Sequence, residues 1–251
     1  MNNYLPTDYQ AFIHTSRYAR WLETENRREG WGETVNRYMD NIVAPLLTDA
    51  KGGKVYKDIQ NAITSLQIMP SMRAMMTAGA AAARDNTCMY NCSYLHVDHP
   101  YAFDEAMFIL LCGTGVGFSV ERQFVSKLQE VPPLFESETT IVVKDSKEGW
   151  AKSYRQLLAL LWAGEIPKWD ISKVRPAGAR LTTFGGRASG PGPLVDLFNF
   201  TVQTFKSAQG RKLSSIECHD LMCFIGQIVV VGGVRRSAMI SLSNLSDDRM
   251  R

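Results

Sequence analysis

The fold class of this chain is decided by Asn86-Thr-Cys-Met-Tyr-Asn-Cys-Ser-Tyr-Leu-His-Val97 and, after it, by Gly113-Thr-Gly-Val-Gly117. The first segment predicts a strand over residues 88–97. A helix over Tyr101–Cys112 separates it from a second strand over residues 118–124, which the glycines open. Strands alternating with helices predict largely parallel pairing and right-handed crossovers. The fold class is therefore α/β, with Cys92 on a strand.

Helices dominate the sequence before this region and alternate with strands after it. Apolar spacing predicts a helical N-terminal segment over residues 1–66, followed by an α/β region over residues 67–251. The helices are expected at 8–21, 31–43, 56–66, 145–162, 193–208 and 214–231, with a short helix ending at Gly79, and the further strands at 139–144, 169–174 and 234–242.

Composition places the chain among soluble globular proteins. It has 251 residues, 45% hydrophobic and 21% charged, with a net charge of +3. A mild positive charge permits anionic substrates such as nucleotides but does not indicate direct nucleic-acid binding. Five cysteines, an odd number, favour a reducing compartment, and no signal peptide or membrane span is evident. These features predict a cytoplasmic location.

Four ligand-type residues near the first strand invite a zinc interpretation: Cys88, Cys92, His96 and His99. Positions four apart on an extended strand are separated by about 13 Å, at roughly 3.3 Å per residue. Zinc ligands lie only about 2 Å from the metal. We therefore predict no metal site here, and expect the cysteines other than Cys92 to be structural.

Three further segments each leave two interpretations open. The glycines of residues 113–117 form either a helix cap and turn or a backbone that a ligand can approach closely. Ser71, in Pro70-Ser-Met-Arg73, is either an ordinary helix cap or a phosphate contact. The glycine-rich stretch over residues 182–192 is too long for a plain turn and is either a functional loop or a surface connection.

Six ordered stretches together resemble the adenosylcobalamin-dependent (class II) ribonucleotide reductases, especially the ribonucleoside-triphosphate reductases. They are Asn91-Cys-Ser-Tyr-Leu95, Cys112-Gly-Thr-Gly-Val-Gly-Phe-Ser-Val120, Asp145-Ser-Lys-Glu-Gly-Trp150, Val174-Arg-Pro-Ala-Gly-Ala-Arg180, Phe184-Gly-Gly-Arg-Ala-Ser-Gly-Pro191 and Val230-Val-Gly-Gly-Val-Arg-Arg-Ser-Ala238. The resemblance covers nearly the whole chain. It implies the first half of a ten-stranded α/β barrel, preceded by the helical segment.

The resemblance also implies roles for particular residues. Cys92 matches the N-terminal member of the redox-active cysteine pair, and Ser71, Asn91 and Gly115 match substrate-binding positions. The loop from Ala179 to Gly190 resembles the specificity loop that couples a deoxynucleotide effector to substrate choice; its candidate residues are Arg180, Gly185, Gly186, Arg187 and Ser189. The implied cofactor is adenosylcobalamin, and the implied partners are the ribonucleotide, the effector, a thioredoxin-type reductant and the C-terminal half of the enzyme.

The sequence departs from the family pattern in one large respect. The Asn-x-Cys-x-Glu segment that carries the family's radical cysteine does not occur in these 251 residues. We therefore expect an N-terminal fragment that does not turn over alone. Two alternatives remain: a diphosphate-specific class II reductase, and a degenerate nucleotide-binding paralogue without activity.

Overall fold

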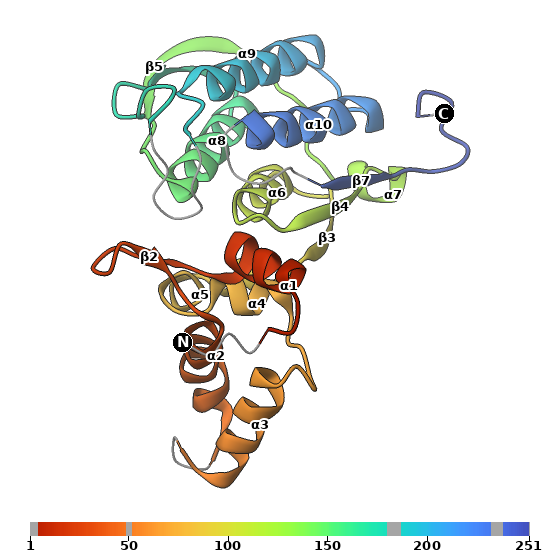
Figure 1. The fold of residues 1–251 in the computed structure, drawn as a ribbon. Coiled ribbons are helices and arrows are strands. Elements are labelled where there is room, and N and C mark those ends of the chain that lie inside the picture. Colours follow the sequence, from red (N-terminus) through yellow and green to blue (C-terminus); the bar gives the residue numbers. More distant parts are fainter. Residues whose placement is uncertain (1–4, 49–51, 180–186, 232–237, 251) are drawn as a thin grey trace. The chain divides into compact units, whose positions relative to one another are not determined.

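The computed structural model describes residues 5–48, 52–179, 187–231 and 238–250. Contacts between residues divide the chain into two compact units, Met1–Asn91 and Cys92–Arg251 (Figure 1). The sequence places the end of the helical segment at residue 66. The contacts instead place the following short helices, up to residue 91, in the first unit. Each unit is described by itself below.

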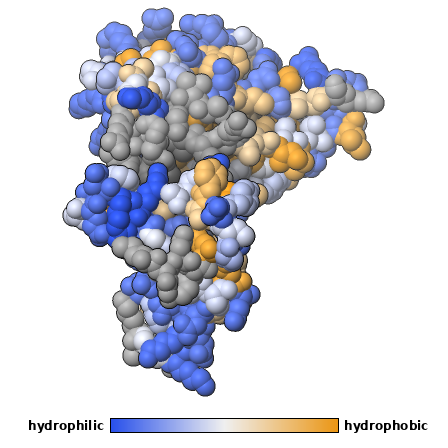
Figure 2. Space-filling view, in the orientation of Figure 1, coloured by the Kyte–Doolittle hydropathy of each residue, from blue (hydrophilic) through white to orange (hydrophobic). Residues whose placement is uncertain are grey.

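The first unit is built of short helices around a small apolar core. Its helices are α1 (Asp8–Ile13), α2 (Trp31–Tyr38), α3 (Lys54–Thr64), α4 (Met72–Thr77) and α5 (Ala80–Arg84), with a hairpin of β1 (Trp21–Leu22) and β2 (Arg27–Arg28). Its buried apolar core is made of Trp31, Val35, Met39, Tyr56, Ile63 and Met75. The outer face of α3 is hydrophilic (Figure 2) and the inner face apolar, as expected for a helix packed on one side.

A buried ion pair ties this unit together. The Arg37 Nε donates to Glu29 Oε1 at 2.7 Å, and its Nη1 donates to the carbonyls of Met75 and Ala78. Burial opposes ionisation of Glu29, but the hydrogen bonds from Arg37 and the Arg20 amide outweigh it and lower the pKa of this carboxyl. One arginine thereby connects the hairpin, α2 and α4.

The expected helix over residues 8–21 is wrong at its C-terminal end. The α-helix ends at Ile13, continues as a π-helical turn over His14–Tyr18, and gives way to β1. Burial explains the change, since the His14 Nε2 bonds the Thr34 hydroxyl at 2.9 Å in the interior. Apolar spacing alone carries no information on this tertiary contact.

The second unit contains two parallel sheets. In the first, β4 (Gly115–Ser119) lies between β3 (Cys92–His96) and β7 (Met239–Leu242). The second pairs β5 (Phe135–Val142) with β6 (Glu165–Asp170). The predicted parallel pairing is confirmed. The structure is mixed α/β, and its described strands form three small sheets, counting the hairpin of the first unit.

Five helices complete the described part of this unit: α6 (Tyr101–Leu111), α7 (Arg122–Val125), α8 (Lys147–Trp162), α9 (Gly192–Ser207) and α10 (Ser215–Val231). The helix α6 packs on β3 and β4, and α8, α9 and α10 pack around α6 and one another. The buried Tyr154 hydroxyl bonds that of Thr201 at 3.1 Å, so the polar atoms that α8 and α9 bury satisfy each other. Apolar side chains also reach the surface on β7, at Ile240 and Leu242 (Figure 2).

Several strand boundaries differ from the sequence-based prediction. The strands β5 and β6 begin at Phe135 and Glu165, four residues before the predicted starts at 139 and 169. Residues Asn86–Met89 form a 3₁₀ turn capped by the Asp85 carboxylate, so β3 begins only at Cys92. The next strand begins at Gly115 rather than Phe118 and stops before α7. Its glycines lie inside the strand because neighbouring strands approach closely: a Cβ at Gly117 would meet the Ile240 side chain at 3.3 Å.

Candidate functional site

The thiol of Cys92 lies at the N-terminal edge of the three-stranded sheet. Cys92 is the first residue of β3, its side chain is exposed, and Asn91 before it is exposed as well. In the parallel register Cys92 pairs with Gly115, the first residue of β4. The Ser93 hydroxyl donates to the Gly115 carbonyl at 2.9 Å and so fixes the two strand starts to each other.

This arrangement provides a solvent-accessible sulfur beside a stretch of backbone without a side chain. Because Gly115 has no Cβ, a ligand can approach the sheet edge next to the sulfur. The structure therefore brings together three of the predicted residues: Asn91 and Cys92, which are consecutive, and Gly115 across the strand pair. All five cysteines are free, and Cys88, Cys112 and Cys218 are buried.

Ser71 acts as a helix cap in the first unit. Its Oγ accepts from the Ala74 amide at 3.5 Å at the start of α4. Arg73, which the sequence suggested as a phosphate donor beside it, is only 2% exposed. The capping interpretation of Ser71 is thus confirmed, whereas a phosphate contact there stays a prediction.

The ends of the candidate specificity loop are held together by main-chain bonds. The Gly178 amide donates to the Ala188 carbonyl, and the Ala188 amide to the Ala179 carbonyl, both at 2.8 Å. Arg187 is exposed, and its Nη1 donates to the Gly178 carbonyl. The Ser189 hydroxyl donates to the Gly190 carbonyl. Arg180, Gly185 and Gly186 lie outside the described residues.

An ion pair anchors the segment leading into this loop, and the sequence analysis missed it. The Arg175 Nε donates to the Asp145 Oδ2 at 2.7 Å. Asp145 is available because Ser146, not Asp145, caps α8, accepting from the Gly149 amide at 3.0 Å. A side chain at Gly149 would collide with the Lys144 carbonyl, so only glycine allows this tight start. The sequence contains the signal, because Asp145 and Ser146 are adjacent residues that can each cap a helix, and only one of them is needed for that role.

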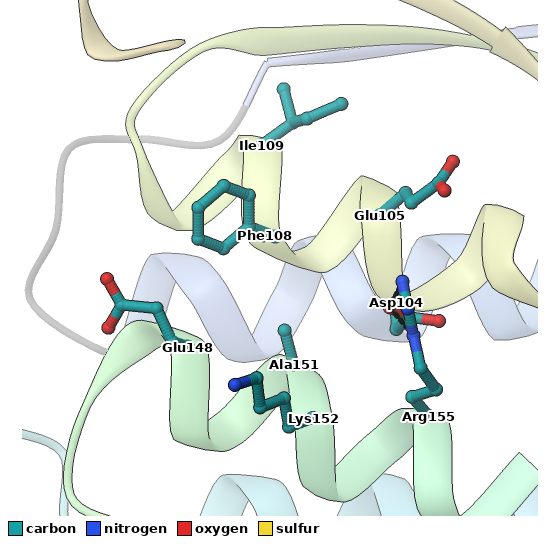
Figure 3. A pocket seen from close by; sticks show the side chains of 8 residues that line it. All are labelled: Asp104, Glu105, Phe108, Ile109, Glu148, Ala151, Lys152 and Arg155. Atoms are coloured by element: carbon teal, nitrogen blue, oxygen red, sulfur yellow. Dashed lines mark hydrogen bonds and ion pairs between the residues drawn. The ribbon is translucent and has the colours of Figure 1, made fainter. Parts of the chain in front are cut away.

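A separate groove of about 290 Å³ runs between α6 and α8 (Figure 3). Phe108, Ile109 and Ala151 line it with apolar surface, and charged side chains surround them. The Arg155 Nε donates to Asp104 Oδ2 at 2.8 Å. Burial raises the pKa of Asp104, and Arg155 offsets only part of that rise. None of the predicted site residues lines this groove.

The two histidines near β3 lie beside the Asp98 carboxylate. Within the described ranges no group of three or more His, Cys, Asp or Glu side chains is arranged to hold a metal ion. The His96 Nε2 lies 3.1 Å from Asp98 Oδ2, and the His99 Nε2 lies 3.7 Å from Asp98 Oδ1. No described helix is long and apolar enough to cross a membrane.

Comparisons with a family model, with curated sequences and with a solved structure agree with one another. The family model for the insertion domain of B12-dependent ribonucleotide reductase matches residues 123–204. Adenosylcobalamin-dependent ribonucleoside-triphosphate reductases of Lactobacillus helveticus and Lactobacillus leichmannii are 26% and 28% identical, over 90% and 92% of this chain. The chain is related to the B12-dependent ribonucleotide reductases.

The fold agrees with this relationship. A crystal structure of a B12-dependent (class II) ribonucleotide reductase matches 96% of this chain with a TM-score of 0.79 at 22% identity, and 42% of that structure is covered. The chain spans about two fifths of the length of the curated reductases, 40% of each. The insertion-domain match includes β5, α8 and β6, whereas Cys92 and Gly115 lie before it.

Proposed function

We propose that this chain forms part of an adenosylcobalamin-dependent ribonucleoside-triphosphate reductase, which converts ribonucleotides into 2′-deoxyribonucleotides. The observation that carries the proposal is the exposed Cys92 thiol at the start of β3, paired with the bare backbone of Gly115. The similarity to the reductases adds support along nearly the whole chain. In this proposal the described strands belong to the first half of a ten-stranded barrel over residues 67–251, preceded by the helical segment 1–66.

Cys92 is proposed as one of two electron-donating cysteines. As the ribose 2′-hydroxyl leaves as water, the Cys92 thiol and a second thiol outside this chain lose two protons and two electrons and form a disulfide. A thioredoxin-type dithiol then reduces that disulfide by exchange, which needs an accessible sulfur. The exposure of Cys92 meets this requirement.

Adenosylcobalamin would supply the radical that starts the reaction when it is bound. The described groove of about 290 Å³ is at the lower end of the range that holds drug-sized ligands, and a corrin with its nucleoside arms is larger. This groove does not fit the cofactor, and we assign no cobalamin-binding residue in this chain. The support for the cofactor is the similarity of this chain to adenosylcobalamin-dependent reductases.

The nucleotide would be held by groups at the sheet edge and beyond it. Asn91 offers amide donors and acceptors next to the reacting sulfur, and Gly115 lets the nucleoside approach the backbone. Ser71 is proposed for the substrate phosphates. Effector-dependent choice of base is assigned to the loop that Gly178 and Ala188 close, through Arg180, Gly185, Gly186, Arg187 and Ser189. The proposed location is cytoplasmic, as the cysteine content predicts.

A protection experiment tests the nucleotide part of this proposal on the chain itself. Alkylation of each cysteine by iodoacetamide is followed by peptide mass spectrometry with and without each ribonucleoside triphosphate. At least one triphosphate should slow alkylation of Cys92, and Gly115→Val should abolish the protection because the added side chain occupies the approach to the backbone. The exposed Cys223 is the internal control and should be unaffected. If no ribonucleotide protects Cys92, the substrate assignment fails.

A further inference from the structure

One turn of α10 places a thiol, an imidazole and a carboxylate in contact. The Cys223 Sγ lies 3.4 Å from the His219 Nε2 and 3.9 Å from its Nδ1. On the other side of the ring, His219 Nδ1 lies 3.0 Å from Asp220 Oδ1. The spacing of four residues puts Cys223 and His219 on the same helix face.

The order of these contacts gives each group a distinct role. A carboxylate can only accept a hydrogen bond, so Asp220 favours the tautomer with the proton on His219 Nδ1. The sulfur lies within 4 Å of both ring nitrogens and nearer to Nε2, the nitrogen that this tautomer leaves without a proton. The Phe118 ring, with its centroid 6.1 Å from that of His219, lies beside the imidazole. Nucleophile, base and orienting group are thus within contact distance of one another.

The thiol is also accessible, in contrast to its neighbour on the same helix. Cys223 is exposed, and the imidazole and carboxylate side chains are 27% and 53% exposed. Cys218 lies on the same helix but is completely buried, and burial strongly raises the pKa of its thiol. Small electrophiles can therefore reach one of these two sulfurs but not the other.

We propose that Cys223 is a second reactive thiol of this chain, separate from Cys92, which His219 activates toward low-molecular-weight disulfides such as oxidised glutathione. In the reaction the Cys223 sulfur attacks one sulfur of the disulfide. A new sulfur–sulfur bond forms as the old one breaks. The thiol proton passes to His219 Nε2 and then to the departing thiolate. The products are a mixed disulfide on Cys223 and one free small thiol.

The base is needed because the thiol is protonated at rest. Partial burial and the Asp220 charge raise the pKa of Cys223. A thiol of raised pKa is intrinsically a stronger nucleophile once deprotonated, so an adjacent proton acceptor gives the largest benefit.

The test is the rate of mixed-disulfide formation at each cysteine of the full chain, measured at pH 7 with oxidised glutathione and peptide mass spectrometry. We expect Cys223 to react at least about tenfold faster than Cys92, a modest general-base effect. Equal rates at the two cysteines would overturn the proposal.

Two substitutions separate activation from simple exposure. His219→Gln keeps a polar side chain of similar size and should lower the Cys223 rate about tenfold while leaving the Cys92 rate unchanged. Asp220→Asn should give a smaller loss, because the ring keeps its base but loses the carboxylate that orients it. An unchanged Cys223 rate in His219→Gln would contradict the assignment. The comparison of Cys223 with Cys92 in the wild-type chain decides the matter even if a variant folds poorly.

Discussion

The two edges of the sheet β3-β4-β7 are built differently. At the C-terminal edge, the strand ends are joined by many side chains: the Ser119 hydroxyl donates to Glu121, Asn244 accepts from the Arg122 amide at 2.7 Å, and His96 stacks on Phe124. At the N-terminal edge, main-chain bonds and the Ser93 hydroxyl hold β3 beside β4, and the thiol of Cys92 faces solvent.

The difference runs against the usual rule for open parallel sheets, in which ligands bind beyond the carboxyl ends of the strands. In this chain the polar groups at the carboxyl ends are largely engaged with one another. The groups available for chemistry lie where the strands begin. We infer that the C-terminal edge serves stability and the N-terminal edge serves the reaction.

The largest effect is expected at the N-terminal edge. In a complete enzyme, Cys92→Ser should lower deoxynucleotide formation by at least about 10³-fold, as for loss of a reacting group, because a hydroxyl cannot form the disulfide. Stability should change by less than about 0.5 kcal/mol since the side chain is exposed. The measurements are a reductase assay with dithiol and a urea unfolding curve. A variant that still reduces ribonucleotides would remove Cys92 from the reaction.

A smaller effect, on stability alone, is expected at the C-terminal edge. Ser119 is fully buried, and its Oγ donates to Glu121 Oε2 and accepts from the Glu121 amide. Ser119→Ala should cost about 1 kcal/mol, the net value of such hydrogen bonds. Urea unfolding gives the cost, and the alkylation rate of Cys92 should be unchanged. A changed Cys92 rate would show that the two edges are coupled.

The smallest effect concerns the start of α10. Arg211 donates two hydrogen bonds to Glu217, and these, together with those from Ser214, lower the pKa of this carboxyl to about 2 despite partial burial. The contribution to stability is therefore complete above pH 4.5, the ordinary value, and is lost as the pH falls toward about 2.

Glu217→Gln tests this contribution without removing the capping box, since glutamine can also serve there. At pH 6 the variant should be less stable by about 0.5 kcal/mol, the size of an exposed ion pair. At pH 2 to 3 the difference between the two proteins should shrink. Unfolding curves at both pH values measure it, and an equal difference at each pH would refute the role of the charge.

The sequence was sufficient for the elements whose ends carry local signals. The helices α8, α9 and α10 were all predicted from the sequence. Their starts carry local signals: a serine cap for α8, a proline in the first turn of α9, and the Ser214–Glu217 capping box for α10. These features involve neighbouring residues in the chain, so their energetics can be read from the order of the amino acids. Parallel pairing followed from the alternation of strands and helices.

The tertiary structure decided what depends on distant residues. The early start of β4 depends on the close approach of Ile240 to Gly117, and the π-helical turn after α1 accompanies the buried bond between His14 and Thr34. Cys92 and Gly115 were predicted as site residues from the resemblance of their motifs. Their pairing at one sheet edge depends on the register between β3 and β4. Register is set by packing across the whole sheet, and no local stretch of sequence contains it.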